Sequence, residues 1–212
     1  MALSPVQLIL LGPPGAGKGT QAAAVAQRLG LRHINPGRIL REEAAQETPV
    51  GREVRDRMGH GDLVDDQLVD RLVRKCLEAL SPGQGFVLDG YPRTADQAQA
   101  LRETLAALHR LRRPPLVAWL QAPPEVLIRR LRHRAREQHR PDDTERAITC
   151  RLQVDRKNAR ALRDALDGWT DVVDIDADQA PDDITEEILG AISRQAAARI
   201  APAASSFFSS DR

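Results

Sequence analysis

The sequence predicts an α/β protein with a doubly wound parallel sheet of five strands and helices on both faces. Two observations carry this prediction. Short apolar runs bounded by turn residues alternate with longer amphipathic stretches, which is the order of elements that builds a parallel sheet. The first three runs are almost continuously apolar, as expected for strands that are buried on both faces.

The composition is that of an ordinary folded protein of one domain. The chain has 212 residues, of which 42% are hydrophobic and 29% charged, and these values exclude wholesale disorder, collagen-like repeats and a disulfide scaffold. The chain has 31 Lys and Arg residues and 30 Asp and Glu residues, so its formal net charge is only +1. The protein as a whole therefore has no strong positive potential that would attract nucleic acid. We therefore expect no nucleic-acid partner, and any electrostatic function must be local.

Five segments are expected to form the strands. Four are apolar runs that end at turn-forming or polar residues, and the fifth is shorter and weaker. In chain order they are residues 6–11, 32–35 (the weaker candidate), 86–89, 116–120 and 171–175.

Amphipathic segments follow these strands and predict the helices. They are residues 19–29, 39–46, 50–58, 65–80, 95–108, 124–136, 144–166 and 181–199. Parallel strands that are joined through helices form right-handed crossovers. In such sheets the ligand lies at the carboxyl ends of the strands, so the binding site is expected there.

Neither end of the chain predicts a membrane segment. The first apolar run spans only six residues and lacks the flanking features of a signal peptide, so we expect a cytoplasmic protein without a membrane partner. Residues 201–212 are mostly small, polar and serine-rich, which predicts a disordered tail. Cys76 and Cys150 lack metal-binding spacing, which predicts buried thiols instead of a disulfide or a zinc site.

A glycine-rich loop follows the first strand directly. Residues 12–18 read Gly-Pro-Pro-Gly-Ala-Gly-Lys and lead into a helix, the setting in which glycines let backbone N–H groups surround phosphate oxygens. The lysine adds a positive charge for the outer phosphates. The sequence therefore predicts a phosphate-binding loop and a sheet of the P-loop NTPase type. The residues expected to surround the phosphate oxygens are Gly15, Ala16, Gly17, Lys18, Gly19 and Thr20.

The residues around this loop resemble those of one family. Gly19 separates Lys18 from the hydroxyl of Thr20, and GKGTQ in this arrangement resembles the adenylate kinase family of nucleoside monophosphate kinases. Further landmarks follow in the family's order. They are residues 35–41 (NPGRILR), residues 61–64 (GDLV), residues 88–94 (LDGYPRT) with Gln97, and the arginines of the lid, Arg130, Arg134, Arg140 and Arg151.

The resemblance implies a single P-loop kinase domain at residues 1–200. Within it, about residues 35–64 would form the insertion that binds the monophosphate, and about residues 130–151 would form a short lid. Only five residues separate Arg134 from Arg140, and none is a cysteine, so the lid resembles the form that holds no zinc.

The activity implied by the resemblance is reversible phosphoryl transfer from ATP to AMP, giving two ADP. Mg²⁺ would be the cofactor and ATP the co-substrate of a monomeric enzyme. Transfer between two polyanions requires cations that gather the phosphates and neutralise the transferring oxygens. The residues expected in this catalytic cage are Lys18, Arg93, Arg134, Arg140 and Arg151. Arg129, Arg132 and Arg136 are instead interpreted as a solvated helix face.

The same resemblance assigns the remaining contacts. Arg130 would stack on the adenine of ATP, while Asp89 and Thr20 would organise Mg²⁺, largely through water. The residues expected to hold the monophosphate are Pro36, Arg38, Arg41, Val64, Gly90, Arg93 and Gln97. The five histidines show no catalytic or metal-binding spacing and are interpreted as surface or packing residues.

One motif departs from the family pattern. Pro36, Gly37 and Arg38 stand where the family has Thr-Gly-Asp, which removes a hydroxyl and a backbone donor beside the acceptor base and a carboxylate that orders water on Mg²⁺. In one interpretation Arg38 adds a phosphate contact, and the pocket binds AMP loosely or prefers CMP, UMP, dCMP or a modified monophosphate. In the other, magnesium organisation is impaired and the chain is a weakly active nucleotide-binding regulator. We favour the first, because every cation of the cage is retained.

Overall fold

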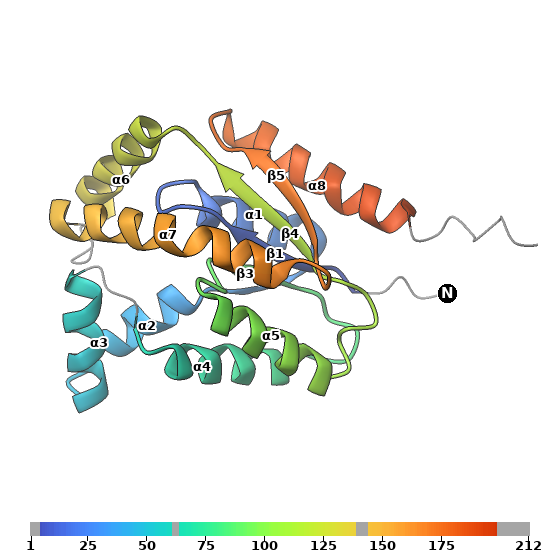
Figure 1. Ribbon diagram of the computed structural model, residues 1–212, viewed down its shortest axis with the longest axis horizontal. Coiled ribbons are helices and arrows are strands. Elements are labelled where there is room, and N and C mark those ends of the chain that lie inside the picture. The colour runs from blue at the N-terminus through green and yellow to red at the C-terminus, as the bar shows by residue number, and fades with distance from the viewer. Residues whose placement is uncertain (1–4, 61–63, 139–143, 199–212) are drawn as a thin grey trace, which may run out of the picture.

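Five parallel strands form one sheet in the order β2-β3-β1-β4-β5 (Figure 1). The structure is a computed structural model, and it describes residues 5–60, 64–138 and 144–198. The strands are β1 (Gln7–Leu11), β2 (Arg32–Ile34), β3 (Phe86–Asp89), β4 (Leu116–Gln121) and β5 (Asp171–Asp176). The fold class predicted from the sequence is confirmed.

The central strand β1 is an almost continuous apolar run because it is buried on both faces of the sheet. All of its residues are buried. Leu8 and Leu10 belong to the hydrophobic core on one face of the sheet, and Ile9 and Leu11 belong to the core on the other face. Successive side chains of a strand point to opposite faces, so a strand that is covered on both faces buries every position.

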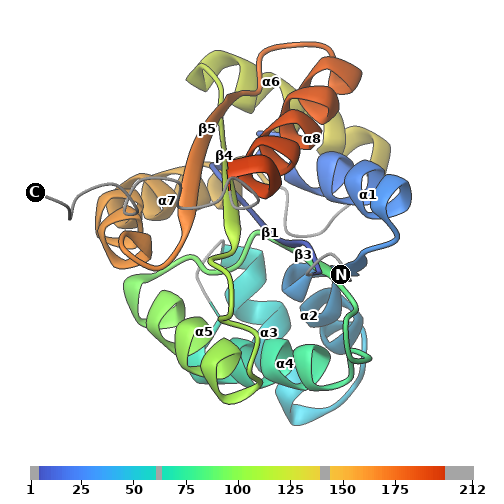
Figure 2. The ribbon, with the colours of Figure 1, turned by 90° about the vertical axis from the view of Figure 1, so that its right-hand side faces the viewer.

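Helices cover both faces of this sheet (Figure 2). The helices that contribute to the core with Leu8 and Leu10 are α1 (Lys18–Leu29), α6 (Pro124–Gln138) and α8 (Pro181–Ala198). Those that build the core with Ile9 and Leu11 include α4 (Asp66–Glu78), α5 (Ala95–Ala107) and α7 (Glu145–Leu166). The sheet therefore separates two hydrophobic cores, each closed by helices.

Two helices, α2 (Pro36–Ala44) and α3 (Pro49–His60), lie where the sequence predicts the monophosphate-binding insertion. α2 begins three residues earlier than predicted, because the side-chain oxygen of Asn35 caps it by accepting a hydrogen bond from the amide of Arg38 at 2.7 Å. Pro36 fits the first turn, where no intrahelical N–H is needed. The other predicted helices and strands begin and end within two residues of those in the structure.

The prediction of buried thiols is wrong in degree. The side chains of Cys76 and Cys150 are half-buried instead of buried. Cys76 packs at the margin of a core, where the apolar face of α4 meets the surface. The predicted tail at residues 201–212 lies outside the described residues.

The topology places a crevice at one edge of the sheet. The chain runs from β1 to β2 and β3 on one side, and then to β4 and β5 on the other side. In an open parallel sheet, such a reversal leaves a crevice beyond the carboxyl ends of the strands. The glycine-rich loop follows the carboxyl end of β1 and therefore lies at this edge.

Candidate active site

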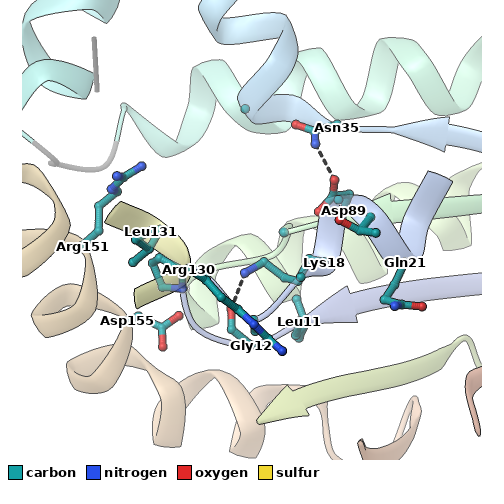
Figure 3. Close-up of a pocket in the computed structure, with 18 of the residues that line it drawn as sticks. Leu11, Gly12, Lys18, Gln21, Asn35, Asp89, Arg130, Leu131, Arg151 and Asp155 are labelled. Carbon is teal, nitrogen blue, oxygen red and sulfur yellow. Dashed lines mark hydrogen bonds between the residues drawn. The ribbon is translucent and has the colours of Figure 1, made fainter. Parts of the chain in front are cut away.

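A cavity of about 720 Å³ opens at the carboxyl edge of the sheet (Figure 3). Its walls come from the glycine-rich loop, the start of α2, the segment after β3, and from α6 and α7. Among the described residues, the cationic side chains that line it are Lys18, Arg38, Arg41, Arg93, Arg130, Arg134 and Arg151, and the carboxylates are Asp89, Glu137 and Asp155. This excess of positive charge suits a ligand that carries several negative charges.

Three glycines shape the loop between β1 and α1. Gly12, Gly15 and Gly17 have φ angles of 125°, 88° and 92°, in the region that favours glycine. A Cβ atom at Gly12 would lie 2.1 Å from the carbonyl oxygen of Leu120, and one at Gly15 would lie 2.7 Å from that of Leu127. The neighbouring backbone therefore excludes a side chain at both positions.

The first turn of α1 offers backbone amides to the cavity. Four other helices begin with a side chain that accepts a hydrogen bond from an amide of the first turn, namely Asn35, Asp65, Thr94 and Thr144. α1 follows Gly17 and has no side-chain cap. Its first amides and the positive end of its dipole are therefore available to an anion.

Lys18 folds back onto the glycine-rich loop. Its Nζ donates hydrogen bonds to the carbonyl oxygens of Gly12 and Pro13, at 2.7 and 2.8 Å. The pKa of Lys18 is lowered to about 8, mainly by burial and also by the charge of Arg93, while the nearby carboxylates act in the opposite direction. A partly desolvated ammonium group that is held only by neutral carbonyls gains from an anionic partner.

Asp89 ends β3 as a buried carboxylate at the cavity. Its Oδ2 accepts a hydrogen bond from the side-chain amide of Asn35 and lies 3.2 Å from Nε2 of His33. The same oxygen faces the first turn of α1, since a Cβ atom at Gly19 would lie 3.4 Å from it. Asp89 thus lies between the end of β3, the start of α2 and the first turn of α1 after the glycine-rich loop.

Two of the histidines interpreted from the sequence as surface or packing residues, His33 and His133, line the cavity. The side chain of His33 is half-buried and lies beside Asp89. β2 and β3 are parallel neighbours, with His33 opposite Val87, so the carboxyl end of β2 comes next to that of β3. The position of residues 32–35 as a candidate strand was the one signal that could have found this contact.

Four cations of the predicted cage lie around one cavity. Lys18 belongs to α1, Arg93 to the segment after β3, Arg134 to α6 and Arg151 to α7. The fifth, Arg140, lies outside the described residues. Side chains from four separate parts of the chain are thus brought to the carboxyl edge of the sheet.

The remaining arginines of α6 divide between the cavity and the solvent. Arg130 lines the cavity, and its Nη1 donates to the carbonyl oxygen of Ala177 at 2.8 Å. Arg129, Arg132 and Arg136 are exposed, which confirms their interpretation as a solvated face.

Several residues predicted to hold the monophosphate line the cavity. Arg38, Arg41, Gly90 and Arg93 are among its walls. Arg38 is exposed on α2, where its Nη1 lies 2.6 Å from Oε1 of Glu42. Arg38 therefore lies at the cavity with a carboxylate of its own helix as partner, and its contact with a phosphate stays a prediction.

The other predicted monophosphate residues are buried beside the cavity, not in its walls. Pro36 and Val64 pack in the interior. Gln97 is buried as well: its Nε2 donates to Asp66 at 2.8 Å, and its Oε1 accepts from the amide of Arg93 at 2.7 Å. In this structure Gln97 holds the segment that carries Arg93, and its contact with an acceptor base stays a prediction.

Asp155 is a cavity residue that the motifs did not single out. It follows Arg151 by about one turn of α7, so both side chains reach the cavity from the same helix face (Figure 3). Burial raises the pKa of Asp155, whereas the charges of Lys18 and Arg93 lower it. The helical spacing from Arg151 is the signal that could have pointed to it.

Residues 5–60, 64–138 and 144–198 show neither a metal cluster nor a membrane-spanning helix. No three or more His, Cys, Asp or Glu side chains there are grouped so that they could hold a metal ion. No helix in these segments has the length and apolar character needed to cross a membrane.

Comparison with known proteins gives strong similarity to one family. Residues 10–168 match the model of the adenylate kinase family. An adenylate kinase from Nocardia farcinica is 39% identical over 189 residues, which cover 89% of this chain and all of that protein. Adenylate kinases from a Cyanothece species and from Xylella fastidiosa are 39% and 43% identical over 86% and 70% of this chain, and over 92% and 79% of their own lengths.

Proposed function

The chain belongs to the adenylate kinase family, and on this premise we propose a role for each wall of the cavity. The protein is a phosphotransferase that moves a phosphoryl group from ATP to AMP and yields two ADP. The other possibilities raised by the sequence, a different acceptor monophosphate or a weakly active regulatory protein, are not favoured by these relatives.

The observation that carries this function is the convergence of Lys18, Arg93, Arg134 and Arg151 on one cavity. A triphosphate and a monophosphate repel each other, so transfer between them depends on cations that hold both in line and stabilise the transferring oxygens. Direct in-line transfer needs no nucleophilic side chain. We therefore assign no covalent intermediate to the protein.

The glycine-rich loop and α1 would hold the phosphates of ATP. The open amides of the first turn and the dipole of α1 favour negative charge at this point. Lys18 would exchange its two neutral carbonyl partners, Gly12 and Pro13, for phosphate oxygens. Arg130, which is anchored to the carbonyl oxygen of Ala177, would flank the adenine from α6.

The walls formed by α2 and by the segment after β3 would hold AMP. Arg41 and Arg93 line this side of the cavity. One guanidinium group can donate two parallel hydrogen bonds to two oxygens of a phosphate. Arg38 would join them when it leaves Glu42 for a phosphate. Gln97 would reach the base only by giving up its contact with Asp66.

Asp89 and Thr20 fit a hydrated Mg²⁺. Both line the cavity, and a carboxylate with a hydroxyl is the hard-oxygen donor set that this ion prefers. Both observed contacts of the Asp89 carboxylate use Oδ2, so we propose Oδ1 as the oxygen that faces the hydrated ion. When bound, Mg²⁺ would neutralise phosphate charge.

A panel assay tests this function. Purified protein receives ATP and Mg²⁺ with AMP, CMP, UMP or dCMP, and formation of the diphosphate is followed. We expect AMP to give the highest kcat/KM, and turnover of another monophosphate in preference to AMP would overturn the assignment.

Two arginine variants on α6 test whether the activity depends on the cations that line the cavity. Arg134→Ala removes a cation that lines the cavity, and we expect kcat to fall by about a hundredfold or more. Arg129→Ala removes an exposed cation of the same helix that does not line the cavity, and its kcat should stay within about twofold. Equal losses in both variants would contradict the proposed cage.

The remaining proposals concern the whole protein. We propose a monomer that works in the cytoplasm, binds no nucleic acid or membrane and requires no zinc. Sedimentation with and without nucleotide would measure the oligomeric state, and a stable dimer would contradict this part.

A further inference from the structure

Asp66, in the first turn of α4, is a carboxylate that the phosphoryl transfer described above does not use. Both of its oxygens accept hydrogen bonds from the segment that follows β3. Oδ2 accepts from the hydroxyl of Thr94 at 2.7 Å, and Oδ1 accepts from Nε2 of Gln97 at 2.8 Å. Asp66 itself does not line the cavity, so its influence on the site passes through these two partners.

Gln97 stands between Asp66 and a cation of the cavity. Its side chain is buried, and its Oε1 accepts a hydrogen bond from the backbone N–H of Arg93 at 2.7 Å. A side-chain amide donates at its nitrogen and accepts at its oxygen, whereas an ionised carboxylate only accepts. A reversed amide would set its oxygen against the carboxylate of Asp66 and its NH₂ group against the N–H of Arg93. Asp66 therefore determines which end of Gln97 faces Arg93.

Thr94 ties the same carboxylate to the start of α5. Its hydroxyl is the N-cap of this helix: it accepts a hydrogen bond from the amide of Gln97 at 3.2 Å and donates its one hydrogen to Asp66. The two partners of Asp66 are thus also joined to each other. This closed set of hydrogen bonds restricts the movement of the Gln97 side chain.

A second carboxylate of α4 holds the same segment one turn further along. Oδ1 of Asp70 accepts a hydrogen bond from the hydroxyl of Tyr91, a buried side chain, at 2.6 Å. Asp66 and Asp70 are four residues apart and therefore lie on the same side of α4, which runs beside α5 (Figures 1 and 2). Since Tyr91 precedes Arg93 and Thr94 follows it, α4 holds the segment on both sides of this arginine.

The backbone position of Arg93 matters because its side chain is braced within the same short segment. Its Nε donates a hydrogen bond to the carbonyl oxygen of Gly90 at 2.9 Å, and both residues line the cavity. A guanidinium group that is held in this way moves together with the backbone that carries it. A change of the backbone at Arg93 is therefore transmitted to the cavity.

We propose that Asp66 is a positioning residue: it fixes the side-chain amide of Gln97 with Oε1 toward the N–H of Arg93, and thereby sets the place of the Arg93 guanidinium group in the cavity. The hydrogen-bonding part of the proposal stands on the geometry alone. Its effect on turnover rests on the proposed function.

The backbone N–H of Arg93 can be observed by itself. Arg93 is the one arginine of the sequence that directly follows a proline. Protein labelled with ¹³C at the proline carbonyl and with ¹⁵N in arginine therefore gives a single correlated amide signal, and its decay in D₂O measures the exchange of this hydrogen.

Asp66→Ala tests the hydrogen-bonding part. The substitution removes the group that orients Gln97, so we expect the N–H of Arg93 to exchange about tenfold faster or more. Asp66→Asn keeps the size of the side chain and one accepting oxygen, and it should give an intermediate rate even if the alanine variant folds poorly. Wild-type exchange in both variants would overturn the proposal, whether or not the protein proves to be a kinase.

A double variant shows whether Gln97 transmits the effect. Gln97→Met removes the oxygen that accepts from Arg93, and adding Asp66→Ala to it should change the exchange rate by less than about twofold, because the link is already broken. Independent effects that multiply in the double variant would overturn the proposed route.

The matched control lies in the first turn of α5. Asp96→Asn removes an exposed carboxylate next to Gln97 that does not line the cavity, and exchange of the Arg93 N–H should stay within about twofold of the wild type. Equal acceleration in Asp96→Asn and Asp66→Ala would show a general charge effect and overturn the proposal.

Steady-state kinetics test the effect on turnover. In Asp66→Ala we expect kcat to fall about tenfold and the KM for AMP to rise several-fold, while the KM for ATP stays within about twofold. Equal rises of both KM values would indicate general damage to the fold and overturn the positioning role. A lower KM for AMP would mean that Asp66 withholds Gln97 from the base, and would overturn it as well.

Removal of Arg93 completes the test. In an Arg93→Ala background, Asp66→Ala should change kcat by less than about twofold, because the group that it positions is absent. A further tenfold loss there would show that Asp66 acts on turnover by another route, and would overturn the proposal. Absence of AMP turnover in the wild type would contradict the proposed function instead, and would leave the exchange result as it stands.

Discussion

Two cationic side chains of the cavity, Lys18 and Arg38, differ in the partners that they would exchange for a phosphate. Lys18 is bound to two neutral carbonyl oxygens and lies near Arg93, so an incoming phosphate replaces weak partners with a strong one. Arg38, in contrast, already has Glu42 as an ionic partner at the exposed surface of α2. Exposed ion pairs contribute little to stability, and Arg38 can therefore exchange Glu42 for a phosphate at small cost.

Lys18→Ala should lower kcat by a hundredfold or more and leave the fold intact. In the proposed mechanism the substitution removes a charge that would stabilise the transferring phosphate, and it removes no hydrophobic core contact. Steady-state kinetics with ATP and AMP, together with a melting curve, would measure both effects. Retention of more than roughly a tenth of the wild-type activity would contradict the proposed role.

Arg38→Asp distinguishes the two interpretations of the altered motif. If Arg38 contacts a phosphate, the KM for AMP should rise roughly tenfold to a hundredfold, because a charge-assisted bond of about 1.5–3 kcal/mol is replaced by repulsion. If the arginine merely replaces a carboxylate that orders water on Mg²⁺, the same change should raise kcat and lower the Mg²⁺ requirement. We expect the first result.

Glu42→Gln is the matched control for Arg38. It removes the ionic partner and leaves the arginine in place, so the KM for AMP should stay the same or fall. A several-fold rise of kcat in Arg38→Asp, with an unchanged KM for AMP, would favour the weak-enzyme interpretation instead.

At the scale of elements, a buried polar link fixes α1, the helix that begins at Lys18 after the glycine-rich loop. Gln21 of α1 donates to the carbonyl oxygen of Pro181 at 2.9 Å, and its Oε1 accepts a hydrogen bond from Thr185 of α8 at 2.7 Å. Both side chains are buried. α8 thus holds α1 in place behind the loop.

Thr185→Val should destabilise the protein by about 1–3 kcal/mol, because it leaves the Oε1 of Gln21 buried without a donor. Thermal unfolding would show a drop of several degrees, while kcat should change little, since Thr185 does not line the cavity.

Ser193→Ala provides the comparison on the same helix. It deletes an exposed hydroxyl that donates only to the carbonyl oxygen of Leu189, and we expect a change below about 0.5 kcal/mol. Equal destabilisation in both variants would show that loss of any hydroxyl from α8 has this effect.

At the scale of the whole molecule, the cavity lies between the central sheet and helices that belong to the two predicted insertions. The loop and β3 belong to the central sheet, whereas α2 and α3 form an insertion and α6 and α7 flank the predicted lid. Two nucleotides that fill the cavity would bridge these parts. Closure would expel water and complete the cage, so motion of these parts should contribute to turnover.

A linked diadenosine polyphosphate should therefore raise the melting temperature more than ATP does at the same concentration. One molecule that occupies both sites binds more tightly to the folded state than a ligand of one site. Thermal shift measurements with both ligands check this. Equal shifts would speak against two adjacent nucleotide sites.

The conformation of the glycine-rich loop and the fold class could be predicted from the sequence because their signals are local. The glycines at positions 12, 15 and 17 precede Lys18 in an unbroken motif, and the structure shows left-handed φ angles at all three glycines. Helix and strand periods arise from neighbouring residues, so even the weak strand at residues 32–35 appears as β2. The cationic lining could be predicted because the arginines belong to recognisable motifs.

Contacts between residues that are far apart in the sequence could not be predicted from such local patterns. His33 meets Asp89 because β2 pairs with β3 in a parallel register, and Asp155 of α7 lines the same cavity as Lys18 of α1. The hydrogen bonds of Gln97 with Asp66 likewise depend on how α4 and α5 pack. Sequence patterns record which face of an element is apolar, whereas the neighbour of each polar side chain follows from strand order and helix packing, which are properties of the assembled chain.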